Sequence, residues 1–110
     1  MPRGLNRVMI IGQLGRDPEM RYTPSGKAVT SFSVAVSQSR VSSEGEPQDV
    51  VEWFHVVAWG DLAERCKRNL EQGSTVYVEG HLQTRAWPGE DLQLRHRTEL
   101  VAEEVIFLDE

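Results

Sequence analysis

The chain has 110 residues, of which 39% are hydrophobic and 26% charged, as expected for one globular domain with a single core. Its one cysteine, Cys66, excludes an internal disulfide, and no group of residues has the spacing of a zinc site. No apolar run approaches the roughly 20 residues that span a membrane. We therefore expect one domain over residues 1–110, in a reducing, cytoplasmic compartment, with no metal, no cofactor and no membrane association.

The formal net charge is −5, and this acidity is unevenly distributed. Residues 1–98 hold all 12 Lys and Arg and 12 of the 17 Asp and Glu, so their net charge is zero. The last twelve residues hold the other five acidic residues and no Lys or Arg. Charges act locally, over a Debye length of about 8 Å at physiological salt. The net charge therefore does not exclude a polyanionic partner.

Two strands are predicted in the first third of the chain. Residues 6–14 are apolar on both strand faces for part of their length, and Gly12 inside them predicts a bend or a close backbone approach. Residues 19–22 form a short extended piece before the turn at 23–26. Residues 27–37 alternate, with Phe32 and Val34 on one face and small hydroxyl residues on the other. Residues 38–49 are polar and read as a long, mobile loop.

The third strand, residues 50–59, differs sharply between its two faces. Alternate side chains of a strand point to opposite faces. The even positions 54, 56 and 58 are Phe, Val and Ala, which suffice for a core. The odd positions carry Trp53, His55, Val57 and Trp59. A core does not explain two tryptophans and a histidine on the opposite face, so this face predicts a functional surface.

One helix and two further strands complete the chain. Residues 61–71 predict a helix with an apolar stripe through Leu62, Cys66 and Leu70, capped by Asp61 with Glu64 at the capping-box spacing. Residues 74–87 form a fourth strand, with Val76, Val78 and Leu82 facing the core, and residues 92–108 a fifth. We therefore predict an all-β fold, a five-stranded oligonucleotide/oligosaccharide-binding (OB) barrel with one short helix between strands 3 and 4.

No catalytic set is present. No nucleophile lies at a sequence spacing typical of a catalytic site from any of the three histidines, His55, His81 and His96. The segment 12–15 is too short for a phosphate-binding loop and lacks the lysine of such a loop. We therefore expect a protein that is not an enzyme.

The three tryptophans are the stronger signal. A single tryptophan is by default a core or interface residue, but Trp53 and Trp59 share the face opposite the core set, and Trp87 ends the next strand beside Arg85. Rings interleaved with Arg suit single-stranded nucleic acid, whose bases stack on rings and whose phosphates meet cations. His55 shares this face, where contact with nucleic acid and a packing role remain equally open. Arg65, Lys67 and Arg68 are expected on the solvated side of the helix.

Three segments in the right order carry a resemblance to a known family. They are RGLNRVMIIGQLGRDPEMRYTPSGKAV, EWFHVVAWGDLAE and GSTVYVEGHLQTRAW. The chain resembles the bacterial-type single-stranded DNA-binding proteins over essentially all its length. The resemblance implies an OB fold, a homotetramer built as a dimer of dimers through the first strand and its Gly12 region, and sequence-tolerant binding and protection of single-stranded DNA. It further implies a role in replication, recombination and repair at the nucleoid.

The resemblance also implies roles for individual residues. Trp53, Trp59 and Trp87 match the family's base-stacking positions. The positions that match phosphate- or base-contacting groups are Arg3, Arg7, Arg21, His55 and Arg85. Arg40 stands where the family often has a further stacking aromatic, and a guanidinium can also stack.

The chain departs from the family at several positions that are often Lys or Arg, namely Asp61, Gln72, Gln83 and Ala86. Fewer cations predict a shallower salt dependence of DNA binding. The family's flexible tail with an acidic tip, which recruits repair proteins, has no counterpart before Glu110, so the chain was either cut or is a tail-less member. An alternative is a protein-interaction module like the primosome's OB protein, and an OB domain accessory to an enzyme is a more distant one.

Overall fold

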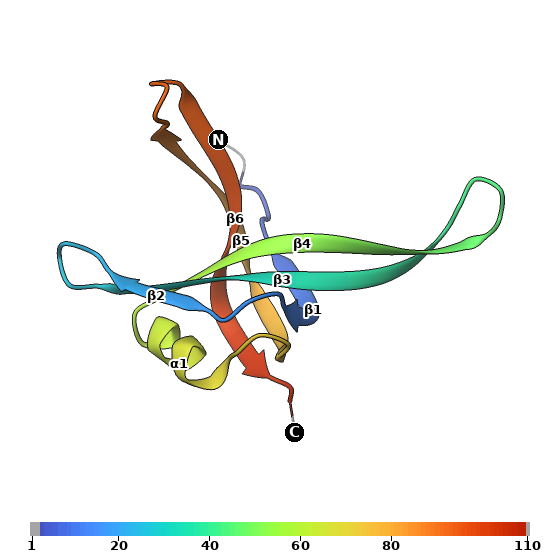
Figure 1. Ribbon diagram of the computed structural model, residues 1–110, viewed down its shortest axis with the longest axis horizontal. Coiled ribbons are helices and arrows are strands. Elements are labelled where there is room, and N and C mark those ends of the chain that lie inside the picture. Colours follow the sequence, from blue (N-terminus) through green and yellow to red (C-terminus); the bar gives the residue numbers. More distant parts are fainter. Residues whose placement is uncertain (1–2, 110) are drawn as a thin grey trace.

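The computed structural model describes residues 3–109 and contains six strands and one helix (Figure 1). In chain order they are β1 (Val8–Leu14), β2 (Glu19–Tyr22), β3 (Ala28–Val41), β4 (Pro47–Trp59), α1 (Asp61–Asn69), β5 (Thr75–Pro88) and β6 (Leu94–Phe107). Five of the strands close into a barrel with α1 between β4 and β5, which confirms the predicted OB fold. The short extended piece at 19–22 is the additional strand β2.

The barrel closes because β1 pairs with two different strands. Its first part lies antiparallel to β5, from the pair Val8–Gly80 to the pair Gln13–Thr75, and its end pairs with β3 at Ala35 and Val34. A parallel pairing of β4 with β6 links the two halves. A Cβ at Gly12 would collide with the carbonyl oxygen of Ala35. The close backbone approach predicted at Gly12 is confirmed, since only glycine fits there.

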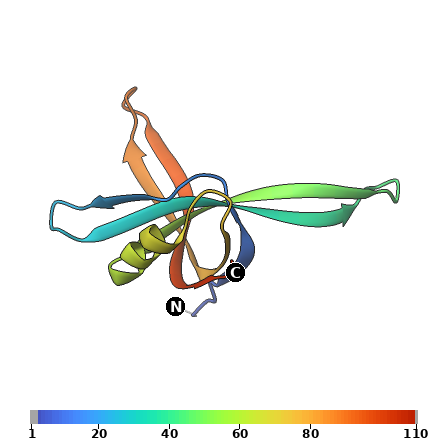
Figure 2. The same ribbon diagram turned by 60° about the horizontal axis from the view of Figure 1, so that its bottom comes forward.

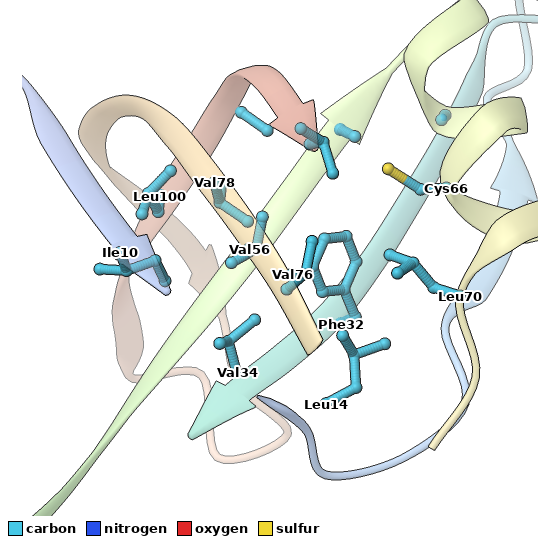
Figure 3. Close-up of a cluster of buried hydrophobic side chains, with 14 of the residues drawn as sticks. Ile10, Leu14, Phe32, Val34, Val56, Cys66, Leu70, Val76, Val78 and Leu100 are labelled. Atoms are coloured by element: carbon cyan, nitrogen blue, oxygen red, sulfur yellow. The ribbon is translucent and has the colours of Figure 1, made fainter. Parts of the chain in front are cut away.

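The core consists of inward-facing side chains from all five barrel strands, with α1 covering one end (Figure 3). Val34, Val56, Val76 and Val78 are fully buried, as strand parity predicts. The helix contributes Ala63, Cys66 and Leu70 on its predicted stripe. The Thr30 hydroxyl donates a 2.7 Å hydrogen bond to the Ala63 carbonyl and ties the helix to β3. Burial raises the pKa of the Cys66 thiol to about 11, so this cysteine is a packing residue.

Two details of the predicted helix are wrong. Its N-cap is Gly60, with φ 66° and ψ −136°, and no side chain caps it, so Asp61 is the first helical residue rather than the cap. This tight turn out of β4 requires a backbone conformation that glycine adopts most readily. The helix also ends at Asn69, not Glu71, where Leu70 returns to an extended conformation.

Two hairpin arms extend beyond the barrel in different directions (Figures 1 and 2). The prediction of a long mobile loop at residues 38–49 is wrong, because β3 and β4 stay paired from Val29–Trp59 out to Val41–Pro47. The arm ends in a turn at Ser42–Glu46, where Ser42 N donates to the Glu46 carbonyl and Gly45 has a positive φ of 83°. Polar residues can continue a strand ladder where both faces meet water, and composition alone did not reveal this.

The second arm is formed by β5 and β6, which remain paired to Pro88–Leu94. The prediction that Leu82 belongs to the core is wrong, since its side chain is 41% exposed. The pairing of β1 with β5 ends at Gly80, and the β5–β6 register shifts at Glu79 and Gly80. Leu82 therefore lies where the strand leaves the barrel. No helix within residues 3–109 is long and apolar enough to span a bilayer.

Candidate nucleic-acid interface

The outward face of the β3–β4 pair carries the predicted aromatic surface. Trp53 is 60% exposed and Trp59 41% exposed, whereas Val56 and Ala58 between them are fully buried on the other face. The prediction that the two tryptophans lie on the face opposite the core set is therefore confirmed, and the role of that face in binding stays a prediction. The partner of Trp53 in β3 is the small residue Ala35 and that of His55 is Ser33, whereas Trp59 pairs with Val29. The small neighbour leaves the Trp53 ring accessible from above the sheet.

Two adjoining grooves lie on this face. The first, called the Trp59 groove, has a volume of ≈ 540 Å³ and is lined by Arg21, Tyr22, Trp59, Arg85, Arg97 and neighbouring residues. The second, the Trp53 groove, has a volume of ≈ 590 Å³ and is lined by Gly15, Arg16, Trp53 and their neighbours. The two grooves share Glu19, Ser31, His55 and Arg97. They therefore form one continuous track across the outward face of the barrel.

Cations lie over two of the rings. Lys27 Nζ is 5.3 Å from the centre of the Trp59 ring. The guanidinium carbons of Arg85 and Arg97 are 5.4 and 5.6 Å from the centre of the Trp87 ring. Because Arg85 and Arg97 also line the Trp59 groove, they connect Trp87 on the β5–β6 arm to the track. Each cation–π contact contributes about 0.5–1 kcal/mol at an exposed site.

A buried carboxylate lies among these cations. Glu99 is only 7% exposed, and its Oε2 is 3.3 Å from Arg85 Nη2 and 3.8 Å from His55 Nε2. The charge distribution along the sequence grouped Glu99 with the acidic C-terminal residues, away from the tryptophan face. That grouping is wrong for Glu99. The register of β6 instead puts it opposite Gln83, inside the Trp59 groove.

The state of His55 follows from its neighbours. Arg97 Nη1 lies 3.1 Å from His55 Nε2, and because a guanidinium can only donate, Nε2 is the acceptor and the imidazole proton is on Nδ1. Burial lowers the pKa of His55 below its ordinary value of 6.5, Arg97 lowers it further, and Glu99 opposes them. His55 is therefore neutral at pH 7 and presents a ring and a hydrogen-bond donor at the groove, not a cation.

The floor of the Trp53 groove is built by the segment between β1 and β2. A Cβ at Gly15 would lie 2.7 Å from the Trp53 ring, so the ring packs directly on glycine backbone. This segment is held by α1 and the turn that follows it. Lys67 Nζ donates a 2.8 Å hydrogen bond to the Pro18 carbonyl, and Gln72 N donates to Asp17 Oδ1 over 2.8 Å. Lys67 is exposed on the helix, as expected from the sequence, and its ammonium group also anchors this segment.

The structure brings some of the predicted site residues together and leaves others apart. Trp53, Trp59, Trp87, Arg21, His55 and Arg85 lie along the track. Arg7 instead forms an ion pair with Glu79 on the outer side of β1 and β5. Arg40 is on the β3–β4 arm, where it donates to Gln38 Oε1 over 3.2 Å, and Arg3 is exposed before β1. None of these three lines either groove.

Two other groove residues, Tyr22 and Glu99, were not singled out from the sequence, and Arg97 was counted there only among the basic residues near the tryptophan face. Tyr22, Arg97 and Glu99 all line the Trp59 groove. For Arg97 and Glu99 a signal was present, since they share a strand parity and alternate with core residues such as Leu100. Tyr22 carried no such signal, because a four-residue strand has too few positions to show a pattern.

Comparison with known proteins supports the same reading of the fold. The profile of the Single-strand binding protein family matches residues 5–108. The chain is 52% identical over 87 residues to Single-stranded DNA-binding protein 1 of Chlorobaculum tepidum, which covers 79% of this chain and 54% of that protein. The chain thus spans about half the length of this curated relative.

Two solved structures have the same fold. One is a Plasmodium falciparum SSB in complex with single-stranded DNA, with a TM-score of 0.90, 28% identity and 99% coverage of both chains. The other is a deletion mutant of the single-stranded DNA binding protein from Thermus aquaticus, with a TM-score of 0.87 and 33% identity, covering 99% of this chain and 53% of that one. With a family profile that matches nearly the whole chain, this protein belongs to the single-strand binding protein family.

Proposed function

We propose that this protein binds single-stranded DNA without sequence preference and without catalysis. The observation that carries the proposal is the continuous track of Trp53 and Trp59, extended by Trp87, with arginines beside the rings. Every base has a face that can stack, and stacking contributes on the order of 1–3 kcal/mol per base. Such contacts hold a strand and do not read its sequence, which suits a protein that covers exposed strands.

The cations supply the second part of the proposed binding. Arg21, Arg85 and Arg97 line the Trp59 groove, where their guanidinium groups can meet phosphates. His55 would contribute a neutral ring or a hydrogen bond. Arg3, Arg7 and Arg40 remain proposed contacts outside the grooves, which a strand that wraps around the barrel would reach. In this proposal residues 1–110 form one DNA-binding domain that protects strands at the nucleoid in the cytoplasm, during replication, recombination and repair.

A homotetramer, built as a dimer of dimers, is the assembly we propose. Within residues 3–109, β1 pairs along Val8–Gly12 with β5 on one side only, and its other edge is open for a second copy of the chain. The outward side chains there are apolar, with Met9 63% and Ile11 57% exposed. An open strand edge beside apolar side chains favours pairing between copies. Light scattering, with and without oligo-dT, measures the mass of the assembly.

Titration with oligo-dT at low salt, followed by tryptophan fluorescence, tests the proposed binding. We expect quenching, because bases stack on the exposed rings. A double-stranded DNA of the same length is the matched control and should quench much less, since its bases are already stacked in pairs. Absence of quenching by oligo-dT would overturn the proposal. Weak DNA binding combined with tight binding to a helicase or its loader would point instead to a protein-interaction module.

A further inference from the structure

Glu99 is the one buried carboxylate in residues 3–109, and it lies in a groove expected to receive a polyanion. The Trp59 groove is lined by three arginines, Arg21, Arg85 and Arg97, and by two glutamates, Glu19 and Glu99. Its formal charge is therefore only +1. A buried carboxylate in such a place costs DNA affinity, so its position calls for an explanation.

The explanation lies in the pairing of β5 with β6. Arg85 and Arg97 are direct cross-strand partners, and like charges directly opposite each other are destabilising. Both guanidinium groups also lie over the one Trp87 ring. Glu99 is two residues from Arg97 on the same strand face and forms an ion pair with Arg85 at 3.3 Å. Its charge offsets the repulsion and fixes Arg85 over the ring.

From this geometry, and building on the proposed function, we propose that Glu99 is an internal counter-ion of the DNA groove. It is a positioning residue that acts through Arg85. While the pair is intact, the charge of Arg85 is already neutralised. A phosphate that displaced the carboxylate would leave Glu99 buried and unpaired, and a cation from solution would have to replace Arg85 beside it. In both cases the net release of counter-ions at Arg85 is close to zero.

This role has a consequence for the salt dependence of binding. On single strands each neutralised phosphate adds about 0.7 to the slope of log K against log salt. Glu99→Gln keeps the shape of the side chain and removes its charge, so Arg85 becomes free for one phosphate. We expect the slope for oligo-dT to steepen by about 0.7, which is an additional loss of roughly 2.6-fold in affinity between 50 and 200 mM salt. Affinity at the lowest salt should rise.

The experiment compares four proteins by oligo-dT titration over a series of salt concentrations. They are the wild type, E99Q, the double variant E99Q/R85Q, and E104Q as a matched control on the same strand but outside both grooves. The double variant has the same net charge as the wild type, so we expect its slope to equal that of the wild type. E104Q should also keep the wild-type slope. Thermal melting checks that each variant is folded.

The outcomes separate this proposal from the proposed function. A steeper slope in E99Q that returns to the wild-type value in the double variant supports the role of Glu99. An unchanged slope in E99Q, or a double variant shallower than the wild type by about 0.7, overturns it while DNA binding itself stands. Failure of the wild type to bind oligo-dT overturns the proposed function instead. The double variant leaves no buried unpaired charge. Comparison of its salt slope with that of the wild type therefore tests the role of Glu99 even if E99Q alone is destabilised.

Discussion

The two faces of the β3–β4 pair share one hydrogen-bonded ladder, yet they differ in the exposure of their largest apolar side chains, although Val57 on the outer face is buried. On the inner face Phe32, Val34 and Val56 are buried in the barrel. On the outer face Trp53 and Trp59 are exposed, although burying a large apolar side chain stabilises a fold by roughly 1.5–3 kcal/mol. The fold forgoes part of this stabilisation at both positions, since Trp53 is 60% and Trp59 41% exposed. The difference indicates that the inner face maintains the barrel, and it agrees with the proposal that the outer face binds DNA.

The largest effect is expected on the inner face. Phe32→Ala removes a fully buried ring and should lower the free energy of unfolding by about 3–5 kcal/mol, measured by urea denaturation. Phe54→Ala should lower it less, because Phe54 is half-buried. Ser31→Ala, on the outer face, is the control and should change stability by no more than about 0.5 kcal/mol. A Phe32→Ala protein of wild-type stability would contradict the assignment of the two faces.

On the outer face the effect should move from stability to binding. Trp53→Ala and Trp59→Ala should each weaken oligo-dT binding by about 1–3 kcal/mol, or roughly 5- to 150-fold, through loss of base stacking. Anisotropy of a labelled oligonucleotide measures this independently of the protein's own fluorescence. The matched variants Trp53→Phe and Trp59→Phe keep a stacking ring and should retain most of the affinity. Unfolding of either alanine variant would instead place that tryptophan in the core.

A smaller effect on binding is expected at Gly15, beneath the Trp53 ring. Gly15→Ala places a methyl group 2.7 Å from the Trp53 ring, so the ring must shift. We expect a few-fold loss of affinity, less than that of Trp53→Ala, with the free energy of unfolding within about 0.5 kcal/mol of the wild type. Gly4→Ala, with open space at its Cβ, is the control. A loss larger than that of Trp53→Ala would show that Gly15 has a separate role.

The smallest effect concerns pH. The folded-state pKa of His55 is lowered by burial, then by Arg97, so below pH 6.5 the unfolded chain binds more protons than the folded one. Stability should therefore fall as the pH drops from 6.5 through the lowered pKa, and rise as the pH returns. Melting temperatures at about pH 5 to 8 measure this. His55→Gln should lose that part of the pH dependence, and an identical profile in both proteins would contradict the prediction.

Some of the candidate site could be predicted because strand parity is a local property. The alternation from Trp53 to Trp59 needs only the backbone of one strand to be read correctly, and the same holds for Phe32 and Val34 in β3. The apolar stripe of α1 likewise depends on helical spacing alone. Where an element leaves the barrel, local patterns failed. Leu82 has the strand parity of the core residues, but it lies beyond the end of the β1–β5 pairing and is exposed. Residues 38–41 and 47–49 have the composition of a loop, but they are paired with each other as parts of β3 and β4.

The sequence by itself determined the class of fold, the two faces of β4 and the family, because alternation, turn chemistry and motif order are written along the chain. Arg85 beside Trp87 was evident from the sequence, but only the tertiary structure decided which charges from other strands meet the tryptophans. Arg97 and Glu99 come from the last strand and reach the groove through the β5–β6 register and the parallel β4–β6 pairing. The groove's charge is therefore a property of strands brought together by barrel closure, and no count along the chain could assign Glu99 to it.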